Sequence, residues 1–179
     1  MNTVTRLIND VALTRNNFIS LIENVNEQQA AFKSSPDKWN IVDNTEHLFW
    51  AEQGALFGMW KTLHAIRDGK VTRTFESQHK EWDIDTLISK TWQEKEIVPA
   101  VAAPRLGGTL AFWKAALSSL QQVLETFGKD IKEEELRLLA HPHPISGDID
   151  FQQRLEFLSF HIKRHQAQVQ NIIDTSKQH

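Results

Sequence analysis

The chain has 179 residues with a formal net charge of −3, and it is 40% hydrophobic and 24% charged. This composition is typical of a globular protein that buries one core. The sequence contains no cysteine, which excludes a disulfide framework, a cysteine metal site and a protein thiol nucleophile. It also lacks the basic run that binds nucleic acid phosphates and the roughly 20-residue apolar stretch that spans a bilayer. We therefore expect a single cytoplasmic domain over residues 1–179, with neither nucleic acid nor membrane as a partner.

Four long segments carry apolar residues in alternating steps of three and four, the spacing that predicts amphipathic helices. No segment shows the strict alternation of a strand. The predicted helices cover about residues 3–32, 40–67, 109–127 and 150 to the C-terminal region. The fold class is therefore all-α, and four amphipathic helices around one core make a four-helix bundle.

Helix-end signals support these boundaries. Asn40 can cap the second helix, with Asp43 in its first turn, where a carboxylate suits the positive end of the helix. Gly128 is expected to end the third helix, and Asp150 with Gln153 resembles a capping box at the start of the fourth.

A long crossover, residues 69–108, connects the second and third helices. Within it we expect a short helix over residues 85–96. The stretch between Pro99 and Pro104 is expected to be extended, because each proline restricts the backbone of its neighbour.

The chemistry of the chain centres on three histidines. His161 and His165 are four residues apart in the last helix, so their imidazoles lie one above the other on one face. His165 also occupies a position where the apolar stripe of this helix requires a buried residue. His47 lies in the second helix. Three neutral imidazoles leave one coordination position open on a zinc-type ion, as in catalytic rather than structural sites.

Two stretches of sequence resemble the DinB-like superfamily, including its YfiT-like branch. The first is Trp39-Asn40-Ile41-Val42-Asp43-Asn44-Thr45-Glu46-His47-Leu48, followed by Ala51-Glu52. The second is His141-Pro142, then Gly147, and then a helix with the pattern His161-x-x-x-His165-x-x-Gln168. Residues 68–105 carry no part of the resemblance.

The resemblance implies an up-down-down-up four-helix bundle, often a homodimer, in which His47, His161 and His165 hold a divalent ion, zinc or nickel. Family members are described as metal-dependent hydrolases or as transferases and isomerases that use low-molecular-weight thiols. The expected function is thus a metal-dependent enzyme on a small-molecule substrate, with a low-molecular-weight thiol as one candidate cosubstrate. The alternative is a non-catalytic helical module that binds a metal or ligand, with Asp43 or His143 filling the fourth position.

Two polar residues are candidates for catalysis. Asp43 lies one turn before His47, where it could orient a ligand or accept a proton, although a capping role is the competing interpretation. Gln168 lies on the face of His161 and His165 and could form a hydrogen bond near the ion, although a polar residue at the end of the bundle is the competing interpretation.

Small residues follow His47 at helical spacing, namely Ala51, Gly54 and Gly58. They predict either open space above the ion or close helix packing. His141 and His143 are minor ligand candidates, because prolines force the loop that carries them to be extended. Trp50 and Trp60 are candidates for a pocket wall.

Overall fold

The computed structural model describes residues 2–71, 77–80, 82–92 and 97–177, and all regular elements in these ranges are helical. The prediction of an all-α fold is confirmed. The elements are α1 (Thr3–Leu21), α2 (Glu27–Ala31), α3 (Ile41–Arg67), α4 (Ile84–Thr91), α5 (Leu110–Asp130), the 3-10 helix η1 (Glu133–Glu135) and α6 (Phe151–Ser176).

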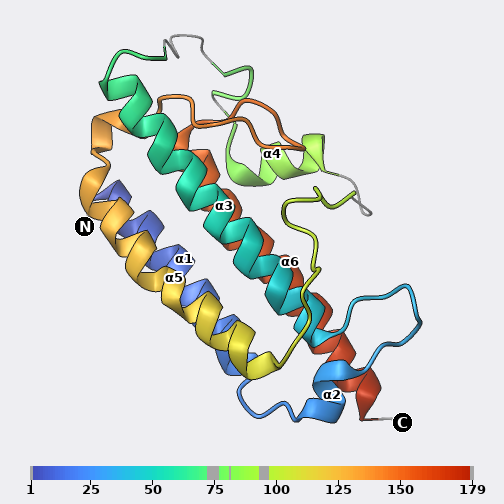
Figure 1. The fold of residues 1–179 in the computed structure, drawn as a ribbon. Helices are drawn as coiled ribbons and strands as arrows, with labels where there is room; N and C mark the ends of the chain where they lie inside the picture. Colours follow the sequence, from blue (N-terminus) through green and yellow to red (C-terminus); the bar gives the residue numbers. More distant parts are fainter. Residues whose placement is uncertain (1, 72–76, 81, 93–96, 178–179) are drawn as a thin grey trace.

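The four long helices α1, α3, α5 and α6 pack side by side around a common core (Figure 1). Around the bundle, α1 packs against α5 and α6, and α3 packs against the same two helices. Figure 1 shows α3 and α5 running in one direction and α1 and α6 in the other. Because α3 and α5 are parallel, the chain returns along the whole bundle between them, and this return is the long crossover over residues 69–108.

Side-chain caps fix where the two helices with the candidate ligands begin. Asn40 and Asp43 form a reciprocal capping box at the start of α3, and Asp150 and Gln153 form another at the start of α6. Each box satisfies two backbone N–H groups that would otherwise lack a partner. Both predicted starts are confirmed.

Other predicted boundaries were wrong. The first helix stops at Leu21, because Asn26 starts the separate helix α2 with its own capping box to Gln29. The third helix continues through Gly128 to Asp130, since Gly128 lies against Ile8 of α1, where the lack of a side chain permits close packing.

The crossover also differs from the sequence prediction. Its short helix α4 ends at Thr91 rather than 96, and residues 93–96 lie outside the described residues. The stretch expected to be extended instead forms a turn, in which Ala102 N–H and Ala103 N–H donate to Pro99 C=O. Proline restricts its own φ and the residue before it, but its carbonyl stays free to accept these bonds, so a turn can follow Pro99.

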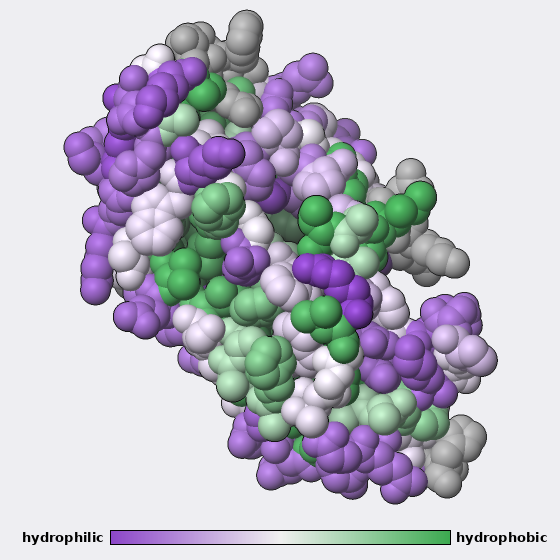
Figure 2. Space-filling model, viewed as in Figure 1, coloured by the Kyte–Doolittle hydropathy of each residue, from purple (hydrophilic) through white to green (hydrophobic). Residues whose placement is uncertain are grey.

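Apolar side chains on the surface are concentrated in a few places. Figure 2 shows apolar patches along the face formed by α3 and α5, between more polar margins. Phe57 of α3 and Phe112 of α5 are more than half exposed. Among the described residues, no helix combines the length and apolar character needed to cross a membrane. Association into a homodimer stays a prediction.

Candidate metal centre

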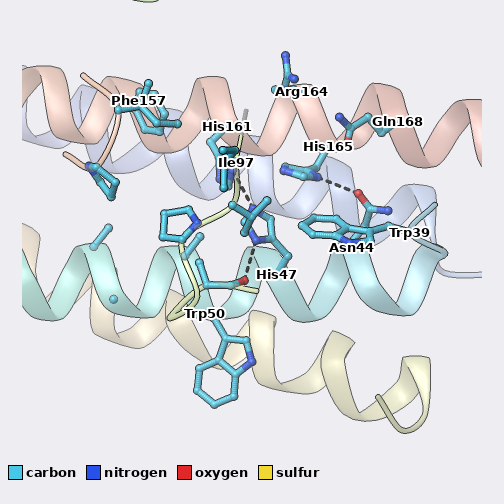
Figure 3. Close-up of a pocket in the computed structure, with 18 of the residues that line it drawn as sticks. Trp39, Asn44, His47, Trp50, Ile97, Phe157, His161, Arg164, His165 and Gln168 are labelled. Carbon is cyan, nitrogen blue, oxygen red and sulfur yellow. Dashed lines mark hydrogen bonds between the residues drawn. The ribbon is translucent and has the colours of Figure 1, made fainter. Parts of the chain in front are cut away.

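The three predicted histidines come together inside the bundle, between α3 and α6 (Figure 3). Nε2 of His47 lies 3.1 Å from Nε2 of His161, and the ring centroids of His47 and His161 each lie 4.7 Å from that of His165. One nitrogen from each ring lies within 4.8 Å of the other two, and all three residues are buried. Residues separated by more than a hundred positions in the sequence thus share one small volume.

Asn44 fixes the proton on His165. Nδ1 of His165 lies 2.8 Å from Oδ1 of Asn44, so the ring donates its Nδ1–H to that oxygen. The orientation of the Asn44 side-chain amide is also fixed, because its Nδ2 donates to the Asn40 carbonyl at 2.8 Å and exchanging its oxygen and nitrogen would break this hydrogen bond. Since the proton is on Nδ1, the lone pair of His165 is on Nε2 and is available to a cation.

The crossover holds His47 in the same way. Nδ1 of His47 lies 2.8 Å from the carbonyl oxygen of Ala102 and donates to it. The chain just beyond Ala102 is bound to α3 by the fully buried carboxylate of Glu46, which accepts from the backbone N–H groups of Arg105, Leu106 and Gly107. The crossover therefore fixes the tautomer of His47 and leaves its Nε2 free to act as a ligand.

Electrostatics keep the centre neutral when it is empty of cations. Burial holds the pKa values of His161 and His165 well below the ordinary value, and the nearby rings act in the same direction. Burial also lowers the pKa of His47, against the opposing effect of its bond to Ala102. Unprotonated imidazole is the form that binds a metal.

The spacing of His47 and His161 fits a shared divalent ion. Two nitrogens that each lie about 2.0–2.1 Å from a tetrahedral zinc would be about 3.3 Å apart. The two Nε2 atoms of His47 and His161 are 3.1 Å apart. In the metal-free protein, His161 Nε2–H can donate to the unprotonated Nε2 of His47 across this distance, and once His161 moves its proton to Nδ1 both nitrogens are available to one ion.

A cavity of about 1040 Å³ opens beside the three histidines. This volume lies at the upper end of the range found for small-molecule sites. Aromatic and basic side chains from α3, α6 and the loops line it, among them Trp39, Trp50, Trp92, Phe157 and Arg164. The cavity gives a small molecule room to reach the histidines.

The two predicted catalytic residues differ in position. Gln168 lines the cavity, and it follows His165 by three residues in α6, a spacing that makes the two side chains neighbours on the helix surface (Figure 3). The carboxylate of Asp43 instead caps α3 at the backbone of Asn40 and pairs with Lys33 at 2.9 Å. Asp43 is also not among the residues that line the cavity. These contacts match the capping interpretation of Asp43.

The small residues of α3 serve two purposes. Ala51 and Gly54 line the cavity, and a Cβ atom added at Gly54 would meet nothing within 4 Å. A Cβ atom at Gly58, by contrast, would lie 2.5 Å from the ring of His141. Gly54 therefore leaves open space, whereas Gly58 allows the loop residue His141 to pack directly on the helix.

The remaining candidates are also placed. Trp50 lines the cavity, whereas Trp60 donates its indole N–H to Asp130 at the far end of α3. His141 and His143 line the cavity, but neither belongs to the group of histidines that could share a cation.

Sequence reasoning missed four supporting residues. Asn44 and Glu46 lie within the motif around His47, so their positions were a usable signal. The carbonyl of Ala102 carries no signal in the sequence, because every residue has the same backbone carbonyl group. Arg154 of α6, which is buried and lines the cavity, gives no signal in the sequence to distinguish it from a surface arginine.

The fold and the histidine cluster together fit a helical protein with a metal site. The sequence profile of the DinB superfamily matches residues 11–169, and the chain therefore belongs to the DinB superfamily. This match confirms the family expected from the sequence motifs. No curated protein and no solved structure matches the chain.

Proposed function

We propose that this protein is a divalent-metal-dependent enzyme acting on a small molecule, by hydrolysis or by transfer of a low-molecular-weight thiol. One observation carries the proposal: three buried, neutral histidines converge beside a cavity of about 1040 Å³. When bound, the ion would supply a Lewis acid that activates either a water molecule or a thiol. Zinc and nickel suit three imidazole ligands.

The residues of the chain would have separate roles in this reaction. His47, His161 and His165 hold the ion, while Asn44 and the Ala102 carbonyl orient two of the rings. We propose that Gln168 contacts the substrate, since it lines the cavity three residues after His165 in α6.

Asp43 acts through the helix end rather than on the substrate in this proposal. Its cap orders the first turn of α3, which presents Asn44 and His47. A module that only stores a metal would need a fourth protein ligand. Within the described ranges, neither Asp43 nor His143 joins the histidine cluster.

The metal site is tested with protein purified without a histidine tag. Metal analysis should give about one zinc or nickel ion per chain, and His161→Ala should bring this close to zero because three ligands become two. Asn44→Leu should weaken binding by about 10- to 100-fold, because His165 loses the acceptor that fixes its tautomer.

His64→Ala is the matched control. His64 is exposed and bonds to Asp130, so this variant should retain the full metal content. Full metal content in His161→Ala would overturn the proposal. With the metal-loaded protein, a thermal-shift screen of cellular thiols and of amide and ester libraries would separate the two reaction types, since ligands of the folded state raise its melting temperature.

A further inference from the structure

The wall of the cavity contains a buried arginine that has no acidic partner in the described part of the chain. Arg154 is 94% buried, since its exposed fraction is 6%, and it lines the cavity. Its Nη2 donates to Nε2 of His141 at 2.8 Å. Its Nε and Nη1, which carry three N–H bonds between them, have no hydrogen-bond partner among the described residues.

The described residues around Arg154 supply no negative charge. Asp150, one turn earlier in α6, caps the helix and pairs with Arg137. Burial alone lowers the pKa of Arg154 to about 10, with no carboxylate opposing it. The residue therefore stays charged at neutral pH. An unpaired buried charge is costly, and native proteins keep such groups where they meet a ligand or serve a function.

The position is built rather than accidental. His141, the one partner of Arg154, fits against α3 only because residue 58 is glycine, where a Cβ atom would come within 2.5 Å of the ring. His143, beside this pair, is neutral because burial and the charge of Arg154 lower its pKa to about 3. The described residues of this part of the wall offer no carboxylate to the guanidinium.

Arg154 and the histidine cluster lie at two places along one cavity. Arg154 precedes His161 by seven residues in α6, which corresponds to about 10 Å along the helix axis. On the facing helix, Ala51 and Gly54 lie between the levels of His47 and His141, and both line the cavity. A small molecule could therefore reach both groups at once.

We propose that Arg154 binds a carboxylate of the substrate, so that the enzyme acts on small organic acids whose carboxylate lies away from the reacting bond. This inference rests on the proposed function insofar as the cavity is the substrate site. One guanidinium matches the single charge of a carboxylate, and Trp92 and Phe157 provide an apolar wall for the carbon skeleton.

The test compares three probes of similar shape: phenylacetate, the neutral phenylacetamide, and benzylphosphonate. Binding to the full-length protein is measured by calorimetry and by tryptophan fluorescence, because Trp92 lines the cavity. The metal-free protein should prefer phenylacetate to the amide by about 10- to 100-fold. Arg154→Met should abolish this preference, and Arg154→Lys should retain part of it because it keeps the charge.

Two control variants separate charge from space. Lys163→Met removes the same charge from an exposed position of α6 and should leave the preference unchanged. Gly54→Val fills open space in the cavity and should weaken the acid and the amide alike.

Three results would overturn the proposal. The first is equal binding of acid and amide by the unmodified protein at millimolar concentrations. The second is an unchanged preference in Arg154→Met. The third is a preference for benzylphosphonate that depends on Arg154, because it would indicate a phosphate site. Because these measurements use metal-free protein, a failure here is independent of a failure to bind zinc or nickel, which would affect only the proposed function.

Discussion

Two arginines among the described residues are buried, and their surroundings are opposite. Arg15 of α1 is fully buried, and its Nε lies 3.1 Å from each carboxylate oxygen of Glu52 on α3. Its Nη1 also donates to Gln121 of α5. Arg154 is almost as deeply buried, but its hydrogen-bond partner among the described residues is a histidine rather than a carboxylate. The first arginine joins three helices of the core, and the second lies in the wall of a cavity.

This difference separates a structural charge from one that we assign to a ligand. The charge of Arg15 is balanced within the chain, so the protein needs nothing else to stabilise it. The charge of Arg154 has no balancing group within the described residues, and an anion from outside would supply one. The two residues should therefore respond differently to the same substitution.

The largest expected effect is on stability and comes from Arg15→Met. This change leaves the carboxylate of Glu52 buried without its partner, and we expect the free energy of unfolding to fall by about 3–5 kcal/mol. Arg154→Met leaves no carboxylate behind and should change it by less than about 1 kcal/mol. Urea unfolding of the metal-free proteins measures both values.

A double variant checks the cause of this loss. Arg15→Met combined with Glu52→Leu removes both charges and should recover most of the lost stability. Equal losses from Arg15→Met and Arg154→Met would contradict the distinction between the two arginines.

Sequence patterns predicted the long helices and the three histidines because each has a local signal. The histidine pair at i and i+4 defines one helix face, and the caps at Asn40 and Asp150 define two helix starts. The break after α1 escaped prediction because Ile22 and Val25 continue the apolar spacing beyond the last helical residue.

The parts of the site that escaped prediction depend on contacts distant in sequence. The partner of His47 is a backbone carbonyl 55 residues away, in a crossover without periodic pattern. The burial of Arg154 depends on how a loop that carries His141 packs against Gly58. Neither contact can be inferred from spacing within one helix.

A smaller effect is expected in the dependence of stability on pH. Burial, and then the charges of Arg154 and His141, lower the pKa of His143 to about 3 in the folded protein, against about 6.5 when unfolded. The unfolded chain then binds more protons, so stability is lost as the pH falls below about 6.5, at up to about 1.4 kcal/mol per pH unit for this residue.

The measurement is urea unfolding of metal-free protein between about pH 7 and 5. His143→Gln should make the loss shallower by about one proton per molecule. Arg154→Met should reduce the loss as well, because the pKa of His143 rises once the neighbouring charge is gone. If both variants follow the unmodified protein, then the guanidinium has no influence on His143.

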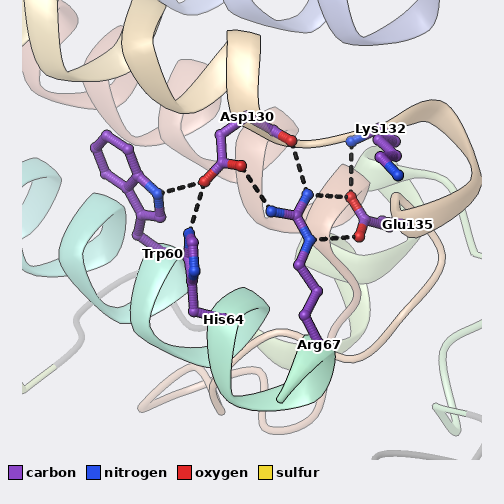
Figure 4. A network of polar contacts seen from close by, with 6 residues as sticks. All are labelled: Trp60, His64, Arg67, Asp130, Lys132 and Glu135. Carbon is purple, nitrogen blue, oxygen red and sulfur yellow. Dashed lines mark hydrogen bonds and ion pairs between the residues drawn. The ribbon is translucent and has the colours of Figure 1, made fainter. Parts of the chain in front are cut away.

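The smallest effect is expected from a third arginine, at the exposed end of the bundle. Figure 4 shows Arg67 between Asp130 and Glu135, with contacts of 2.6 and 2.7 Å. Its side chain is 27% exposed, so solvent screens these pairs, and Arg67→Met should cost only about 1 kcal/mol of unfolding free energy. Salt should shrink this difference, whereas it should affect the buried pair of Arg15 much less.

Acid gives a second way to test the same network. The bonds from Arg67, with smaller contributions from His64 and Trp60, lower the pKa of Asp130 to about 2, below the value of about 3.9 in an unfolded chain. The stability that this carboxylate contributes is therefore present above about pH 4 and is lost as the pH falls towards 2. Arg67→Met and the unmodified protein should converge in stability over that range. The contrary result is a cost for Arg67→Met that is as large as that for Arg15→Met and insensitive to salt. That result would contradict the distinction between the exposed and the buried ion pair. The presence of a carboxylate partner would then be the one feature that separates Arg67 and Arg15 from Arg154.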